Sequence, residues 1–349
     1  MELLSVTMND GVKPRSEIEG KDNSSEDKSN YKIVRKGDMV YNSMRMWQGA
    51  NGISPCDGIV SPAYTVLMPK QEINNGYFAA LFKSTKLINE FRKNSQGMTS
   101  DTWNLKYPQI ETIKVQIPSV SEQDKVSALF SVLDARIVAQ AQLVESLKKY
   151  KRGLLMHFFS DETTRQWRQY TISQIGKVIT GSTPPTNDRS NYDGDLMFCS
   201  PGDIGEQKYI SSTEKRVSPK GFALGRPIPP SSVIVTCIGL IGKLGIATSD
   251  MITNQQINAL IVSGDFDHEF IYYAFENFFP KYRSKVSMQT LPILSKSEFE
   301  KLLIKVPNLN VQHKISNYLA GMDKRIEQTQ QELNVIQDLR RGIIQKLFI

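Results

Sequence analysis

The chain has 349 residues, of which 40% are hydrophobic and 23% charged, a composition that excludes a disordered protein. Its length favours two or more domains over one. A net charge of +7 and a pI near 9.1 suit a polyanionic partner, although many basic proteins bind no nucleic acid.

The cysteines and the N-terminus limit the compartment and the site chemistry. Cys56, Cys199 and Cys237 stand far apart with no C-x-x-C pair, which argues against a zinc site and against a disulfide framework. The first residues have no apolar signal core, and no run approaches about 18 consecutive apolar residues. We therefore expect a cytoplasmic chain with no membrane span and no bound metal.

Residues 1–118 are predicted to form the first domain, with a polar loop, alternating strand patterns and a helix near residues 77–93. Asn, Gln, Arg, Ser and Thr side chains read base edges and anchor phosphates, and recognition residues concentrate in surface loops. The alternative is that such residues only cap turns. The candidates for DNA contact are Asn42, Ser43, Arg45, Trp47, Gln48, Ser61 and Thr102.

Residues 119–160 are predicted to form a long helix. Its apolar residues recur at alternating steps of four and three, which is the heptad pattern of a coiled coil. The polar residues Gln140 and Lys151 interrupt this stripe. Its apolar members are Val126, Phe130, Leu133, Ile137, Val144, Leu147 and Leu154, and the pattern continues to Phe158.

Residues 161–308 are predicted to form a second domain that repeats the first at an offset of 193, which aligns Gly52 with Gly245 and Asp57 with Asp250. The stretch from Trp167 to about Ser200 has no counterpart, so either the true start lies upstream or the first domain is shortened at its start. The loop residues differ between the repeats. The second domain's candidates for DNA contact are Gly181, Ser182, Thr183, Arg226, Lys243, Asn254, Gln255, Gln256, Gln289 and Thr290.

Residues 309–349 repeat the long helix, because adding 189 to each position of the first stripe gives a second stripe without a gap. Thr329 and Arg340 take the two polar positions. The apolar members are Ile315, Leu319, Met322, Ile326, Leu333, Ile336 and Ile343, and the pattern continues to Leu347.

Two stripes of equal length bury each other most simply. Parallel packing in register would place Lys151 level with Arg340, and like charges facing across a helix pair are destabilising. Antiparallel packing places Lys151 near Met322 and Arg340 near Leu133, with the charged heads reaching outward to solvent. A helix of about 37 residues is roughly 55 Å long, so we expect a spacer between the domains. The alternative is a pair of core helices with no spacing role.

No nucleotide-binding glycine motif and no Asn-Pro-Pro-aromatic tetrapeptide is present in the sequence. One enzymatic alternative stays open. Asp195, followed by Glu206 and Lys208, fits the loose pattern of metal-dependent nucleases, although such spacing often arises by chance. A coiled-coil scaffold that reads no DNA is a second alternative.

Four sequence features are informative, and the last two of them occur in both repeats. They are a G-x-T-P loop at residues 181–184, the segment SPGDI at 200–204, a proline followed by glutamine at the entry to each long helix (Pro118 with Gln123, Pro307 with Gln312), and an Arg-Gly pair near each helix end (Arg152-Gly153, Arg341-Gly342). With these features the chain resembles the specificity subunit of type I restriction-modification systems over essentially its whole length.

In that family, two target-recognition domains separated by an antiparallel helix pair read the halves of a split DNA sequence. The helices dock two modification subunits, which bind S-adenosylmethionine and methylate adenine, and a restriction subunit can join. The resemblance therefore implies a non-catalytic subunit with no cofactor of its own and with double-stranded DNA and methyltransferase subunits as partners. The implied fold class is α+β, an internal two-fold repeat with two mixed domains and an antiparallel coiled coil.

Overall fold

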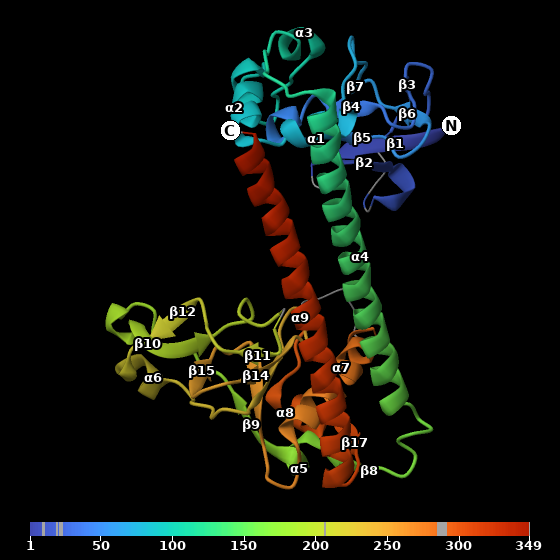
Figure 1. Ribbon diagram of the computed structural model, residues 1–349. Helices are drawn as coiled ribbons and strands as arrows, with labels where there is room; N and C mark the ends of the chain where they lie inside the picture. Colours follow the sequence, from blue (N-terminus) through green and yellow to red (C-terminus); the bar gives the residue numbers. More distant parts are fainter. Residues whose placement is uncertain (9–10, 19, 21–23, 206, 285–291, 349) are drawn as a thin grey trace. The chain divides into compact units, whose positions relative to one another are not determined.

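The structure is a computed structural model that describes residues 1–8, 11–18, 20, 24–205, 207–284 and 292–348. The chain divides into two compact units, which are described separately: residues 1–144 with 329–349, and residues 145–328. The long helices α4 (Val120–Phe158) and α9 (Leu309–Leu347) are each continuous over 39 residues. Each of them contributes one part to each unit (Figure 1).

The first unit contains two small sheets, with strand orders β2-β1-β6-β3 and β5-β4-β7, and three short helices that follow them. Both termini belong to this unit (Figure 1). The bounds are β1 (Glu2–Thr7), β2 (Gly11–Pro14), η1 (Arg15–Glu17), β3 (Lys32–Val34), β4 (Met39–Asn42), η2 (Met46–Gln48), β5 (Asn51–Ile53), β6 (Gly58–Val60), β7 (Tyr64–Leu67), α1 (Asn75–Leu81), α2 (Thr85–Asn94) and α3 (Tyr107–Ile110).

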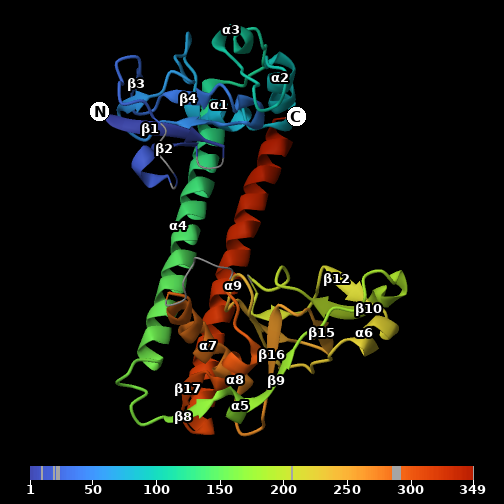
Figure 2. The ribbon, with the colours of Figure 1, turned by 180° about the vertical axis from the view of Figure 1, so that it is seen from behind.

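The second unit contains a five-stranded sheet of order β11-β14-β13-β16-β9, a three-stranded sheet of order β12-β10-β15 and the pair β17-β8. Figure 2 shows α7 and α8 beside the strands. The bounds are β8 (Arg168–Thr171), α5 (Ile172–Ile175), β9 (Gly176–Thr180), η3 (Arg189–Asn191), β10 (Tyr192–Cys199), β11 (Tyr209–Ile210), β12 (Lys215–Val217), α6 (Pro219–Leu224), β13 (Val233–Thr236), β14 (Leu244–Ala247), β15 (Met251–Thr253), β16 (Ile257–Val262), α7 (His268–Arg283), α8 (Lys296–Lys301) and β17 (Leu303–Val306).

The predicted repeat is confirmed by the topology. Strands β4 to β7 and β13 to β16 follow the same order, and α3 and α8 each precede the run that ends in proline before a long helix. The predicted gap is wrong in its extent. β1 pairs parallel with β6 as β10 pairs parallel with β15, so β1 corresponds to β10. β8, α5, β9 and the loop after them, and also β11, have no counterpart in the described part of the first unit.

The core of the second unit is built around α7. Phe270, Tyr273, Phe279 and the α8 residue Phe299 are each fully buried, and the cluster includes Leu319 of α9. Burying a large apolar side chain stabilises a fold by about 1.5–3 kcal/mol. These residues therefore hold the strands of this unit firmly against its part of the long helices.

All the predicted stripe residues from Val126 to Leu154 and from Ile315 to Ile343 are buried or half-buried. The last turn of α9 departs from the heptad. Leu347 is 48% exposed, while Ile344 and Phe348 are buried. The reason is a ring contact, because the centroids of Phe348 and Phe130 lie 6.3 Å apart in a stacked arrangement.

Within each unit the two long helices run in opposite directions. In the first unit, Phe130 contacts Phe348 while the Gln140 side chain donates to the Thr329 carbonyl at 3.2 Å. In the second unit, Lys151 pairs with Asp323, while the ring centres of Phe158 and Tyr318 lie 6.0 Å apart. In each case a higher number on α4 meets a lower number on α9, as the charge argument predicts.

The predicted orientation of the Lys151 head is wrong. The Lys151 side chain is only 12% exposed, and its Nζ lies 2.7 Å from Asp323 Oδ1 and 2.9 Å from Glu276 Oε1. Glu276 lies on α7, and the apolar pattern of the long helices does not predict that α7 contacts Lys151. Burial alone would lower the pKa of Lys151, but the charges of Glu276 and Asp323 outweigh it and raise the pKa.

Each long helix is joined to its unit by one buried glutamine. Gln312 Nε2 donates to the Pro307 carbonyl at 2.9 Å, and its Oε1 accepts from the backbone N–H of Asp267, the N-cap of α7, at 2.9 Å. Gln123 makes the equivalent pair of bonds in the first unit, to the Pro118 carbonyl and from the backbone N–H of Asn74, the N-cap of α1. The two glutamines therefore fix the angle at which each helix leaves its strands.

One helix, α4, is long and apolar enough to cross a membrane by length and composition, with a mean hydropathy of 1.2 over its most apolar 18 residues. This differs from the sequence expectation, which considered only uninterrupted apolar runs. The same criterion is met by core helices of proteins that never enter a membrane, so a single such helix is a weak indication.

Candidate nucleic-acid interface

Predicted recognition residues of the second unit meet at one end of its five-stranded sheet. β9 ends at this end, β16 begins there, and the antiparallel pairing of β13 with β16 brings the end of β13 to the same place. The loop after β9 lies on the turn before β16, because the Gly181 N–H donates to Ile257 at 3.0 Å and the Ser182 N–H to Thr253 at 2.8 Å. The fold thus gathers residues 181–183 and 254–256.

Gly181 is required where this loop crosses the turn. A Cβ at this position would lie 2.2 Å from the carbonyl oxygens of both Thr253 and Asn254. These are backbone atoms, so no side chain can rotate away to make room. The loop therefore passes close to the turn only because residue 181 is glycine.

Exposed side chains stand on this framework. The Thr183 hydroxyl donates to Gln255 Oε1 at 2.6 Å, and both side chains are exposed. Arg226 donates one N–H to the Thr180 carbonyl at 3.0 Å, which leaves most of its guanidinium donors facing solvent. Threonine, glutamine and arginine so placed can donate and accept hydrogen bonds at a base edge or a phosphate.

Asn254 and Gln256 shape the turn. Asn254 Oδ1 accepts from the Gln256 N–H at 3.0 Å, and the Gln256 carbonyl accepts from the Cys237 N–H at 2.7 Å. This second bond places the β13–β14 loop, which contains Lys243, next to the turn. Gln289 and Thr290 lie outside the described residues.

The first unit repeats this framework. The Ser43 N–H donates to the Ala63 carbonyl at 3.3 Å, as Cys237 donates to Gln256. Ser61 Oγ accepts from the Ala63 N–H at 3.4 Å, as Asn254 does from Gln256. The Leu105 N–H donates to the Ser43 carbonyl at 2.8 Å, which adds the loop that contains Thr102.

Several first-unit candidates already have partners within the fold. Ser43 is 7% exposed and its hydroxyl donates to the Ala63 carbonyl. The Trp47 indole N–H donates to the Met44 carbonyl at 3.2 Å. Thr102 Oγ1 donates to the Thr99 carbonyl at 2.9 Å, and Asn42 Oδ1 accepts from the Met44 N–H at 3.1 Å. Arg45 and Gln48 are half-buried on the same loop.

An aromatic cluster beside this loop was missed from the sequence. The rings of Trp47 and Trp103 lie 5.2 Å apart edge to face, and the Arg92 guanidinium lies 5.8 Å from the Trp47 ring centre. An exposed arginine over an indole is a favourable place for a phosphate or a base. The signal was the pair of tryptophans, but 56 positions separate them in the sequence.

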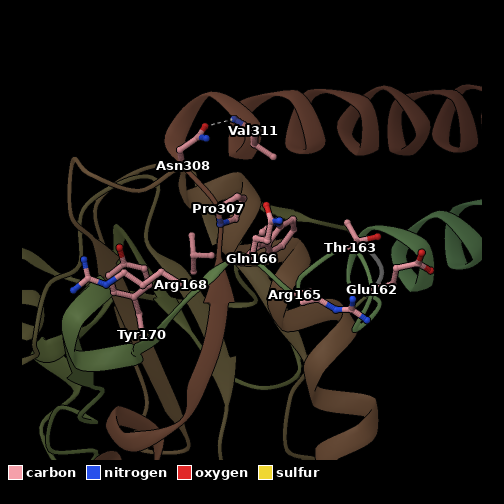
Figure 3. Close-up of a pocket in the computed structure, with 11 residues that line it drawn as sticks. Glu162, Thr163, Arg165, Gln166, Arg168, Tyr170, Pro307, Asn308 and Val311 are labelled. Carbon is pink, nitrogen blue, oxygen red and sulfur yellow. Dashed lines mark hydrogen bonds between the residues drawn. The ribbon is translucent and has the colours of Figure 1, made fainter.

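A cavity of about 790 Å³ lies elsewhere in the second unit, where α4 leads into β8 and β17 leads into α9 (Figure 3). Arg165, Trp167, Arg168 and Tyr170 line it, and the Arg168 guanidinium lies 5.0 Å from the Tyr170 ring centre. The predicted recognition residues that the structure describes do not line this cavity.

The arrangement expected of a nuclease does not form around Lys208. Its side chain is 9% exposed, its Nζ pairs with Glu269, and it also bonds the Tyr273 hydroxyl at 2.8 Å. Glu206 lies outside the described residues. Among the residues that the structure describes, no group of three or more His, Cys, Asp or Glu is placed to hold a metal ion.

The buried thiols of Cys199 and Cys237 stay protonated at neutral pH. Burial raises the pKa of both Cys199 and Cys237 to about 12. All three cysteines are free.

Comparison with known families agrees with the resemblance seen in the sequence. The family model for the type I restriction modification DNA specificity domain matches the chain twice, over residues 5–149 and 164–338. The two matches coincide with the two repeats and together include most of the chain.

Individual proteins that are similar to this chain are also named as type I restriction enzyme specificity subunits. The type I restriction enzyme HindI specificity subunit of Haemophilus influenzae is 21% identical over 319 residues, which cover 69% of this chain and 70% of that protein. The type I restriction enzyme MjaIX specificity subunit of Methanocaldococcus jannaschii is 27% identical over 191 residues, which cover 53% and 44%.

A solved structure of the type I restriction-modification S subunit from M. genitalium matches with a TM-score of 0.59 and 17% identity, covering 91% of this chain and 84% of that one. A chain from a structural study of complex assembly in the type I R-M system gives a TM-score of 0.60 at 18% identity, covering 93% and 84%. At these identities the structures support the fold.

Proposed function

The chain belongs to the type I restriction-modification DNA specificity family, and from this membership we propose that it reads a DNA target in two halves, one with each repeat. It is a specificity subunit, so it recognises DNA, and the catalytic activities belong to other subunits. The proposal to be tested is that each repeat recognises one half of the DNA target.

One observation carries the proposal. The same hydrogen-bonded loop framework occurs twice, at Ser43 with Ala63 and at Cys237 with Gln256, while the side chains that it presents differ. The second unit offers Thr183, Gln255 and Arg226, whereas the first offers an arginine and two tryptophans. Equivalent scaffolds with different exposed donors suit two different half-sites.

We assign the long helices the role of a spacer that pairs as an antiparallel coiled coil. A continuous helix of 39 residues is about 58 Å long at 1.5 Å per residue. We expect the two recognition sites to lie closer together than the helix ends, so the unread stretch between the half-sites should be about one turn of DNA. Its length is fixed by the helices and not by the loops.

The outer faces of the helices suit partner subunits. Val132 is 68% exposed, Val138 54%, Met156 63% and Val335 65%, so apolar side chains on both long helices face solvent in the isolated chain. We propose that two modification subunits cover these residues, that S-adenosylmethionine binds to those subunits, and that a restriction subunit can join them. A cytoplasmic location follows from this assembly. The isolated chain should accordingly be poorly soluble or bind DNA weakly.

Mapping of methylated adenines across the genome tests the proposal. In cells that carry the modification subunit, the presence of this gene should add methylation at one split motif, and its removal should abolish that motif alone. A continuous motif, or no change in methylation, would contradict the proposed reading of two half-sites.

A further inference from the structure

The exposed side chain of Arg92 rests on an aromatic ring in the first unit. Its guanidinium carbon lies 5.8 Å from the centre of the Trp47 ring, within the range of about 6 Å in which an indole attracts a cation. Among the residues that the structure describes, none forms an ion pair or a hydrogen bond with this guanidinium. The N–H donors of Arg92 are therefore available to a ligand.

The indole ring of Trp47 is held in place by two contacts. Its N–H donates to the Met44 carbonyl at 3.2 Å, and the Trp103 ring meets it edge to face with the centroids 5.2 Å apart. Trp103 is itself positioned by two backbone hydrogen bonds, of 3.0 and 2.8 Å, which join Gln96 to Asn104 and close the loop after α2. The fold therefore sets the orientation of the ring beneath the guanidinium.

The backbone that carries Arg92 is also firmly placed. Arg92 follows Phe91 on α2, and Phe91 and Leu87 are only 1% and 4% exposed. The helix begins with a capping bond, in which the Leu87 N–H donates to Ser84 Oγ at 3.3 Å. A side chain that is already held in one place loses less freedom when it binds a ligand. The arginine is thus prepared for a directed contact.

This arginine and its ring lie beside the hydrogen-bonded framework of the first unit. Trp47 belongs to η2, in the loop that follows Ser43. Trp103 precedes Leu105, whose N–H donates to the Ser43 carbonyl at 2.8 Å. Both tryptophans therefore belong to the loops that the first unit is proposed to present to DNA, and Arg92 is held against those loops.

The second unit uses an arginine at the end of its helix differently. Arg283, in the last turn of α7, donates to the Ile241 carbonyl at 2.9 Å and is half-buried. Ile241 lies in the β13–β14 loop, the counterpart of the β4–β5 loop that contains Trp47. In the second unit, a donor of the arginine is thus bonded within the fold. In the first unit, a ring takes the place of that carbonyl and uses no donor.

Guanine is the ligand that this arrangement fits best. A guanidinium is planar, and its N–H groups form a fork that matches the O6 and N7 acceptors of guanine in the major groove. A phosphate is contacted by many kinds of donor and does not need the fork in one orientation. Reading a guanine does need it, and the ring and the helix together supply that orientation.

Building on the proposed function, we propose that Arg92 specifies a guanine, on either strand, of the half-site that the first unit reads. Its guanidinium donates to O6 and N7 of that base, and Trp47 is a positioning residue that holds the fork toward the base. Because Arg283 is bonded within its own unit, this contact belongs to the first half-site alone.

Arg92→Lys tests the proposal, because lysine keeps the charge and loses the fork. Methylated adenines are mapped in cells that carry the modification subunit. One guanine of one half-site should relax to other bases, with discrimination at that position reduced about tenfold or more, while the other half-site stays unchanged. Lys93→Gln is the matched control. It removes the charge of the neighbouring exposed side chain, which pairs with Glu90, and should leave the methylated motif as it is.

Modified DNA tests the natural complex, so the result does not depend on the folding of a variant. The chain bound to its modification subunits is titrated with target DNA in which each guanine is replaced in turn. Deazaguanine, which lacks the N7 acceptor, should weaken binding about tenfold at the proposed position. Inosine keeps N7 and O6 and should bind as guanine does. With Arg92→Lys or Trp47→Leu, deazaguanine and guanine should bind equally at that position.

The outcomes separate this proposal from the reading of DNA in two halves. If the natural chain directs methylation to no split motif, the proposed function fails. A split motif that Arg92→Lys leaves unchanged would overturn the guanine contact alone. That includes a uniform fall in methylation with the same motif, since Arg92 would then contact a phosphate. If Arg92→Lys abolishes methylation, the natural complex decides, and equal binding of deazaguanine and guanine at every position would overturn the proposal.

Discussion

Lys151 pairs with Asp323 in the second unit as Arg340 pairs with Asp134 in the first, and the repeat relates the two pairs. Adding 189 to 151 gives 340, and adding 189 to 134 gives 323. Each cation thus finds the carboxylate that the other long helix carries at the repeat-related position. Parallel packing in register would bring the two cations level instead, so the pairs favour the antiparallel register.

Despite this relationship, the two pairs should contribute differently to stability. Lys151→Ala leaves the half-buried carboxylates of Glu276 and Asp323 without a cation, which should cost about 3 kcal/mol. Arg340→Ala leaves Asp134, whose side chain is 51% exposed, in contact with water, and should cost less than about 1 kcal/mol. Chemical unfolding of both variants checks this, and equal losses would contradict it.

Glu276 should make stability depend on pH. Burial raises the pKa of Glu276 above its ordinary value of 4.5, against the opposing charge of Lys151. A raised pKa in the folded state means that this contribution is complete below pH 4.5 and is lost as pH rises through the folded value.

Glu276→Gln removes the titrating carboxyl group and with it the loss of stability as pH rises. The free energy of unfolding of the variant minus that of the natural chain should therefore increase as pH rises from about 4.5 through the folded pKa. Unfolding of both proteins in a series of buffers measures the difference. A difference that stays constant or decreases over this range would show that Glu276 is not penalised by burial.

Gln312 should be essential to the joint between α9 and its unit. The side chain is 2% exposed, and Gln312→Ala leaves the buried N–H of Asp267 without its acceptor. We expect a loss of about 1–3 kcal/mol in calorimetric unfolding. Gln328→Ala, on an exposed face of the same helix, is the control and should change stability by less than about 0.5 kcal/mol. Similar losses in both variants would argue against a joint at Gln312.

Gly181→Ala should impair DNA recognition by the second unit and leave that of the first unit intact. The added Cβ meets two backbone carbonyl oxygens at 2.2 Å, so the loop that carries Thr183 must move away from Gln255. Methylation at the natural site should fall, and competition with half-site DNA should show that the first half-site is still bound. Gly264→Ala, which has no atom within 4 Å of its Cβ, should behave as the natural chain does. Normal methylation with Gly181→Ala would contradict the assignment.

Much of the helix pair could be predicted from sequence because burial of a long helix leaves a regular apolar spacing. The regularity ends at the last turn, where Phe348 rather than Leu347 is buried against Phe130. The burial of Lys151 could not be predicted, since Glu276 reaches it from α7 and no pattern within α4 encodes that contact.

The candidate site was predictable in position but not in detail. A polar loop between strands is visible in the sequence, and the fold brings Thr183 and Gln255 together as one cluster. Whether a polar side chain is free depends on its neighbours. Ser43 and Thr102 have polar side chains suited to recognition, yet their hydroxyls bond within the fold, whereas Arg92 gained its place over Trp47 only through tertiary packing.

The central claim is that the helices set the distance between two half-sites, and lengthening both helices tests it most directly. Seven residues in heptad register, inserted after Val144 and after Gln328, keep the stripe intact and add about 10 Å, or about three base pairs. Mapping of methylated adenines should then show both half-sites unchanged and the spacer longer by about three base pairs. Altered half-sites, or an unchanged spacer with methylation retained, would contradict the account.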